Sequence, residues 1–130
     1  MAEEDDIIDN LILQGAGAKN FGRSSVVTGD FTISSSSGTT NFDVNTITGS
    51  GANNTFVVAG ANTIQVRGAN NFPSGFESIS LASNSTVNYI SDLAQTIAAV
   101  PAPGYGNLTV QKVTASGTST KTAAGNIIPS

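Results

Sequence analysis

The stretch "GSGANNTFVVAGANTIQVRGANNF", Gly49–Phe72, contains the pattern that decides the fold. The triplet Gly-Ala-Asn begins at Gly51, Gly60 and Gly68, at intervals of nine and then eight residues. Glycine and asparagine favour turns, because glycine reaches positive φ without a steric cost and the asparagine side chain bonds to nearby backbone. Between the triplets, apolar and polar residues alternate, as they do on the two faces of a β-strand. A turn that recurs around one strand length predicts the successive edges of a meander or the rungs of a β-solenoid.

Short runs rich in Val, Ile, Thr and Phe recur through the rest of the chain, each closed by small polar residues. They include "NLILQ", "SVVTGDFTIS", "FDVNTITG", "FESISLA", "STVNYI" and "NLTVQ". Their spacing is close to the roughly 8–12 residues of all-β architectures. The sequence therefore predicts an all-β, elongated repeat, β-solenoid-like or β-helix-like, with a β-sandwich as the alternative. Ser91–Val100 has apolar residues at helical spacing, but it lies between a strand-like run and the breaker run "PAPGYG", and we reject a helix there.

The two ends of the chain carry a similar sequence. The matching positions are Asn10 with Asn107, Leu11 with Leu108, Gln14 with Gln111, and Lys19 with Lys121. The offset is 107 − 10 = 97 residues for the first three pairs and 121 − 19 = 102 for the last, so five residues are inserted between them. We expect one repeat module over residues 9–130, whose start at 9–33 is echoed at 106–130. Residues 1–8 are expected to form a separate acidic segment.

Charge is sparse and excludes some partners. Charged residues make up 11% of the chain, less than half of the roughly 25% usual in soluble domains. Four of the nine acids lie at residues 3–6, which leaves five acids against five bases. The bases are scattered singly, so the basic patch that nucleic acid requires is missing. No apolar run approaches the roughly 20 residues that span a bilayer, and we expect no membrane insertion. Cysteine is absent, which removes disulfides and thiolate chemistry.

No catalytic, cofactor or metal site is predicted. Beyond the first eight residues the acids are single residues, at least ten positions apart: Asp9, Asp30, Asp43, Glu77 and Asp92. Acid–base catalysis needs paired carboxylates, and nucleophilic triads lack their usual members because the chain has no His or Cys. The glycine-rich "GAGAKNFG" lacks the Gly-Lys-Ser/Thr ending of a phosphate loop, which favours a hairpin turn. Isolated Asp30 and Asp43 are interpreted as turn or strand-end residues, and Tyr89 and Tyr105 as packing residues.

A set of short motifs follows a recognisable order. The motifs are "TVNY" (Thr86–Tyr89), "AQTI" (Ala94–Ile97), "YGNLTV" (Tyr105–Val110) and "KTAAGN" (Lys121–Asn126), continued by "TGDFTI" (Thr28–Ile33) in the earlier copy. In this order the chain resembles modules of very large secreted surface proteins of Bacteroidota, among them repeats of gliding-type adhesins and other cargo of the type IX secretion route. The resemblance implies a β-rich, non-catalytic stalk or adhesive module.

The expected function is structural or adhesive, on a cell surface outside the cell. The expected partners are neighbouring repeats or copies of the same chain, because one repeat cannot cover its own two ends; surface glycans are further candidates. Two alternatives remain open. One is a phage virion component, a fibre or decoration protein, and the other is a carbohydrate-binding or carbohydrate-cleaving β-helix.

Overall fold

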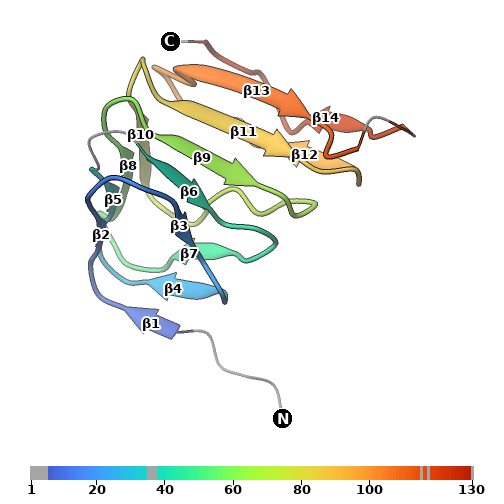
Figure 1. Ribbon diagram of the computed structural model, residues 1–130. Helices are drawn as coiled ribbons and strands as arrows, with labels where there is room; N and C mark the ends of the chain where they lie inside the picture. The colour runs from blue at the N-terminus through green and yellow to red at the C-terminus, as the bar shows by residue number, and fades with distance from the viewer. Residues whose placement is uncertain (1–5, 35–37, 115, 117, 130) are drawn as a thin grey trace.

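The computed structural model describes residues 6–34, 38–114, 116 and 118–129, and every regular element in these ranges is a β-strand. The strands, in chain order, are β1 (Asp6–Ile8), β2 (Leu11–Leu13), β3 (Lys19–Asn20), β4 (Ser25–Val27), β5 (Phe31–Ile33), β6 (Thr39–Asn41), β7 (Ile47–Gly49), β8 (Thr55–Val58), β9 (Thr63–Val66), β10 (Ser78–Leu81), β11 (Thr86–Ile90), β12 (Gln95–Ile97), β13 (Asn107–Gln111) and β14 (Lys121–Ala123). Figure 1 shows these strands stacked along one axis, with β1 and β14 toward opposite ends.

The strands form four parallel sheets. Sheet A has the order β1-β4-β7, sheet B β10-β8-β5-β2, sheet C β13-β11-β9-β6-β3, and sheet D β12-β14. The chain passes sheets A, B and C in turn and then begins the next coil, giving a β-solenoid of about five turns. The predicted solenoid is confirmed. The sandwich alternative is wrong, because a sandwich is built from antiparallel sheets and all described pairs are parallel.

The three Gly-Ala-Asn triplets are the three corners of a single coil. Gly51 precedes β8, Gly60 lies between β8 and β9, and Gly68 follows β9. The interval of eight to nine residues therefore measures one side of the coil. The predicted hairpin at "GAGAKNFG" is wrong, because this turn is also a corner of a coil. This turn leads from β2 in sheet B to β3 in sheet C, which are not neighbours.

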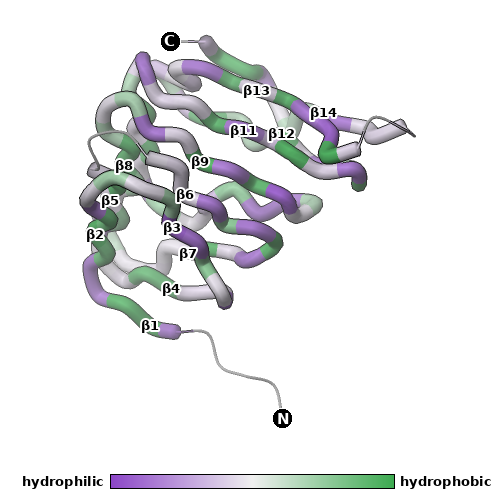
Figure 2. The backbone as a smooth tube through the Cα atoms, viewed as in Figure 1, coloured by the Kyte–Doolittle hydropathy of each residue, from purple (hydrophilic) through white to green (hydrophobic). Residues whose placement is uncertain are grey.

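Alternating burial builds the core. Strands β4, β5 and β7 bury their first and third residues, and β8 and β9 their second and fourth. Figure 2 shows the corresponding alternation of apolar and polar residues along the stacked strands. The largest fully buried side chains are Phe31, Phe42, Phe56, Tyr89, Tyr105, Ile33, Ile47, Ile64, Val27, Val58, Val66 and Val87. Inside the coils the rings of Phe31 and Phe56 stack with their centroids 4.9 Å apart.

Buried amides tie one coil to the next at the corners. The side-chain nitrogen of Asn71 donates to the carbonyl oxygens of Asp43 (2.8 Å) and Asn45 (2.9 Å) in the preceding coil. Its side-chain oxygen accepts a hydrogen bond from the backbone N–H of Gly68 (2.8 Å). Asn45 in turn donates to the carbonyl oxygen of Phe21, one coil earlier (2.8 Å). These bonds add side-chain links between coils to the backbone pairing, and the carbonyl oxygen of Asp43 also accepts the N–H groups of Arg67 and Gly68.

The solenoid changes its cross-section after β11. Sheet B ends at β10, whereas sheet C continues to β13 and sheet D begins with β12. The backbone N–H of Thr96 in β12 donates to the carbonyl oxygen of Ala69 (2.7 Å), a corner residue of the coil below. The segment Ser91–Val100 thus contains a strand and no helix, as expected. The last coils extend sheets C and D while the upper edge of β10 stays without a partner among the described strands.

Candidate functional site at the two ends of the solenoid

Both ends of the solenoid present strand edges that no described strand covers. At the first end these are the edges of β1, β2 and β3, and at the second those of β10, β13 and β14. Unpaired edges carry free backbone N–H and C=O groups, which are templates for pairing with another chain. On β2, Leu11 N–H donates to Asp30 and Leu13 C=O accepts from Ser34. Because these directions alternate along a strand, the N–H and C=O of Ile12 face the open end.

Among the described residues, five of the seven exposed large apolar side chains lie on or near the end strands, and the other two, Val44 and Leu93, lie elsewhere. Ile7 in β1 is 77% exposed and Ile12 in β2 is 59% exposed. At the second end Val110, Val113 and Ile128 are also exposed. Several unpaired strands with apolar side chains are unusual for a free surface and are typical of an interface.

Two segments at opposite ends share one order of pairings. We name residues 6–27 the opening segment and residues 103–129 the closing segment. In the opening segment Ile8 pairs in parallel with Val27, and in the closing segment Tyr105 pairs in parallel with Pro129. The offsets are 105 − 8 = 97 and 129 − 27 = 102, the same two offsets as in the sequence echo. The closing segment therefore repeats the path of the opening segment, with β13 in the place of β2 and β14 in the place of β3.

The repeat is displaced sideways by one sheet. β2 and β3 belong to sheets B and C, whereas β13 and β14 belong to sheets C and D. Strands β11 and β12 lie below the closing segment and pair with its strands β13 and β14. No described strand lies below the opening segment.

Polar side chains of the closing segment donate hydrogen bonds to the coil below it. The Lys121 ammonium donates to the carbonyl oxygens of Ser91 (2.8 Å) and Leu93 (3.0 Å). Asn107 donates through its side-chain nitrogen to the carbonyl oxygen of Ser85 (3.0 Å). Desolvation lowers the pKa of Lys121 from its usual value. Each of these hydrogen bonds gives a partner to a corner carbonyl oxygen of the coil below.

The opening segment has the same residue types at the same places, without a coil to bind. Lys19, the counterpart of Lys121, turns back and donates to the carbonyl oxygens of Gly15 (2.7 Å) and Gly17 (3.3 Å) in its own turn. Asn10, the counterpart of Asn107, accepts the backbone N–H of Asp30 with its side-chain oxygen (2.8 Å). Its side-chain nitrogen has no partner within the described ranges.

Side-chain hydrogen bonds between coils follow one polarity at nearly all described positions. The donor lies in the later coil and the acceptor in the earlier coil. Asp30 N–H donates to Asn10, Thr55 N–H to Asp30 (2.8 Å), and Glu77 N–H to Asn54 (3.0 Å). An exception is Asn88, whose side-chain nitrogen donates to Gln111 in the later coil (3.4 Å). Continued across a contact between two copies, this polarity would direct donors of the first end, such as the side-chain nitrogen of Asn10, toward acceptors of the second end.

Asp92 is an additional clamp on the closing segment. Its carboxylate accepts the backbone N–H groups of Thr114 (2.9 Å) and Val113 (3.0 Å). The bond from Thr114 N–H is the main reason that the pKa of Asp92 is lowered from its usual value of 3.8, with a smaller contribution from the charge of Lys112. The sequence shows Asp92 only as an isolated acid, because its partners are backbone groups more than twenty residues away.

Acid should loosen this clamp. A carboxylate with a lowered pKa in the folded state contributes stability above its unfolded pKa and loses it as the pH falls through the folded value. We expect the amide protection factors of Val113 and Thr114, measured by hydrogen exchange, to fall as the pH is lowered from about 5 to about 2, because the pKa of Asp92 in the folded chain lies below 3.8. In Asp92→Asn they should be low throughout and independent of this pH range. Equal protection factors at both pH values in the unsubstituted chain would contradict the clamp.

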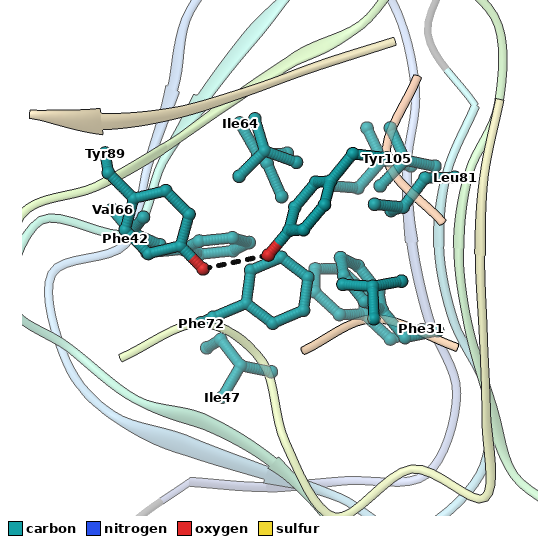
Figure 3. Close-up of a cluster of buried hydrophobic side chains, with 14 of the residues drawn as sticks. Phe31, Phe42, Ile47, Ile64, Val66, Phe72, Leu81, Tyr89 and Tyr105 are labelled. Carbon is teal, nitrogen blue, oxygen red and sulfur yellow. Dashed lines mark hydrogen bonds between the residues drawn. The ribbon is translucent and has the colours of Figure 1, made fainter. Parts of the chain in front are cut away.

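Tyr89 and Tyr105 are core residues, as expected from the sequence. Each is about 1% exposed. The Tyr105 hydroxyl donates to Ala98 C=O (2.7 Å), Ala98 N–H donates to the Tyr89 hydroxyl (2.9 Å), and the two hydroxyls lie 3.2 Å apart. Figure 3 shows both rings pointing into the cluster of buried side chains. Burial raises the pKa of both phenols. Inside the core the pair joins β11 to the start of the closing segment.

The scattered acids have separate structural roles. Asp30 accepts the N–H and hydroxyl of Thr55, and Asp43 has a positive φ of 52° in a turn, so both are the turn or strand-end residues that the sequence predicted. Across the described part of the chain, no three His, Cys, Asp or Glu side chains are grouped so that they could hold a metal ion. Within the same ranges no helix is long and apolar enough to cross a membrane.

The strongest functional observation in this chain is thus the geometry of its two ends. It combines open edges, exposed apolar side chains, a repeated segment and complementary hydrogen-bonding groups. Comparison of the chain with known protein families, with curated proteins and with solved structures found no match.

Proposed function

We propose that the chain is a non-catalytic structural module that stacks head to tail with neighbouring repeats or with copies of itself. The observation that carries this proposal is the pair of open, complementary ends. In a solenoid each coil contacts only its neighbours, so an uncovered terminal coil lacks half of its stabilising contacts. A second module restores them, and the parallel sheets allow continuation in the same direction.

In this role the module serves as a stalk or adhesive element of a bacterial surface protein or filament outside the cell. Low charge and small polar side chains at the corners suit an extended array whose units touch along one axis. The outer face of sheet C is the surface we assign to glycan contact, because its outward columns are uncharged. These columns contain Thr39, Thr63 and Thr86, and beside them Asn41 and Gln65. A virion fibre would use the same stacking and is the alternative setting.

Replacing Ile12 by proline should abolish head-to-tail association. Proline removes the one N–H of β2 that faces the open end, and it is tolerated on edge strands because no internal partner is lost. We expect sedimentation velocity to show concentration-dependent association of the unsubstituted chain and a monomer for Ile12→Pro.

The matched control is Ile12→Val, which keeps the N–H and a β-branched side chain. It should associate like the unsubstituted chain. An unsubstituted chain that stays monomeric at all concentrations, with circular dichroism showing it folded, would refute the proposal.

A further inference from the structure

We propose that head-to-tail association occurs by exchange, in which the opening segment of one copy takes the place of the closing segment of another copy on β11 and β12. This inference rests on the proposed stacking function and names its interface. The partner is a second copy of this chain, and the contact is a continuation of the parallel pairing already present within the chain.

The first argument is the shared path of the two segments. Both contain the same parallel pair, Ile8 with Val27 and Tyr105 with Pro129, followed by strands at equivalent positions. A segment with the same path and the same spacing of strands fits the edges that β11 and β12 offer. Exchange of equivalent elements between copies is a low-cost route to association, because the incoming segment makes pairings of the same kind as the segment it displaces.

The second argument is that the two segments carry the same hydrogen-bond donors at equivalent positions. Superposed on the closing segment, the opening segment places Lys19 at Lys121 and Asn10 at Asn107. Lys19 would then exchange the carbonyls of its own turn for those of Ser91 and Leu93, which Lys121 now binds. The side-chain nitrogen of Asn10 would reach the carbonyl oxygen that Asn107 now occupies.

The third argument is the shallow burial of the two strands of the closing segment. Strand β13 has no buried residue and β14 has none, whereas β11 below them buries three of its five residues. Displacing β13 and β14 therefore exposes little apolar surface. The buried side chain that leaves the core with them is Tyr105, whose counterpart in the incoming segment is the apolar Ile8. The chain's own closing segment competes with an opening segment from another copy for the same strands. The exchanged fraction therefore rises with protein concentration.

Asp92 sets the balance between the two occupants. Its carboxylate holds the turn after β13, and this turn contains the five residues that the opening segment lacks. The clamp therefore favours the chain's own closing segment over an incoming opening segment. Charged neighbours of this clamp are Lys112 and Lys121.

Disulfide trapping in this cysteine-free chain tests the exchange. Gln14 corresponds to Gln111, which is paired with Ile90 in β11. In an exchanged assembly, positions 14 and 90 of different copies are neighbours on adjacent strands, within the Cα separation of about 4.4–6.8 Å that a disulfide needs. Within one copy they lie in different sheets and three coils apart, roughly 14 Å or more along the axis. We expect the full chain carrying Gln14→Cys and Ile90→Cys to form linked multimers in a glutathione buffer, in amounts that rise with concentration.

The control pair is Gln14→Cys with Ala82→Cys. These positions become neighbours if β2 simply pairs with the open edge of β10 in the register that extends from Leu13 to Leu81. Linkage of 14 with 90 and not with 82 supports exchange. Linkage of 14 with 82 alone overturns exchange and leaves head-to-tail stacking intact. Linkage of neither pair overturns both proposals, and equal linkage of both pairs overturns exchange because it indicates random collision.

A second measurement uses the two lysines as a matched pair. In the background of the 14/90 variant, Lys19→Ala should lower the linked fraction several-fold, because the incoming segment loses its grip. Lys121→Ala should raise it several-fold, because the resident segment is loosened. If both lysines have only local structural roles, neither substitution changes the linked fraction, and that result would overturn the exchange.

Discussion

Replacing Phe31 by alanine is expected to lower the free energy of unfolding by about 3–5 kcal/mol, the usual cost of deleting a buried phenylalanine. Phe31 is fully buried. Its ring stacks on Phe56 and lies edge-on to Phe21 and Phe42, at centroid distances of 6.1 and 6.2 Å. The cavity would lie between coils whose backbones are fixed by parallel pairing on both sides, so neighbouring side chains can refill little of it.

Urea unfolding followed by far-ultraviolet circular dichroism measures this loss. The control is Phe21→Ala, because Phe21 packs on Phe31 and Phe42 in the same cluster of rings but is only partly buried near the first end. It should cost about half as much, since less apolar area leaves water there. A loss below about 1 kcal/mol in Phe31→Ala would mean that the stacked rings do not form the core.

Replacing Gly51 by alanine is expected to cost about 3 kcal/mol or more, at or above the usual limit for an overpacked site. A Cβ atom there would overlap the carbonyl oxygen of Thr28 in the coil below. The obstacle is backbone, which cannot rotate away, so two coils must move apart.

Gly60 provides the comparison in an identical Gly-Ala-Asn triplet. It has a positive φ of 64° and open space around the position of a Cβ atom. Gly60→Ala should cost only about 1–2 kcal/mol, the usual penalty of a left-handed backbone for alanine. Equal losses in the two variants, measured by the same urea unfolding, would show that the contact with Thr28 is not tight in solution.

The sequence predicts the strands and the solenoid because both depend on local patterns. Alternation of apolar and polar residues and recurring turn triplets are visible in any one stretch, such as Gly49–Phe72. The residues that pair between successive coils cannot be predicted from the sequence, because the number of residues per coil varies. Along sheet B, Leu11 pairs with Phe31, Phe31 with Phe56, and Phe56 with Ile79, at separations of 20, 25 and 23 residues. The triplets recur faster than the coils because they mark corners of one coil.

The candidate site at the two ends is only partly predictable from the sequence. The echo of Asn10 and Lys19 in Asn107 and Lys121 is a sequence signal, and the structure gives both copies the same pairings. What the closing segment grips is backbone, at Ser85, Ser91 and Leu93. Every residue has a backbone carbonyl, so the residue types do not indicate which carbonyls act as acceptors. The expected boundary after residue 8 falls inside the first coil, since β1 already pairs with β4; residues 1–5 lie outside the described part of the chain.

The linked tyrosines give the chain a built-in optical reporter of one end. The chain has two tyrosines and no tryptophan. Both phenols lie in the core at the second end, Tyr89 on β11 and Tyr105 within the closing segment. Since burial raises the pKa of each, opening of the closing segment should let the tyrosinate absorption develop at a lower pH in an alkaline titration. Near-ultraviolet spectra of the unlabelled protein therefore follow events at its second end without interference from the remaining coils.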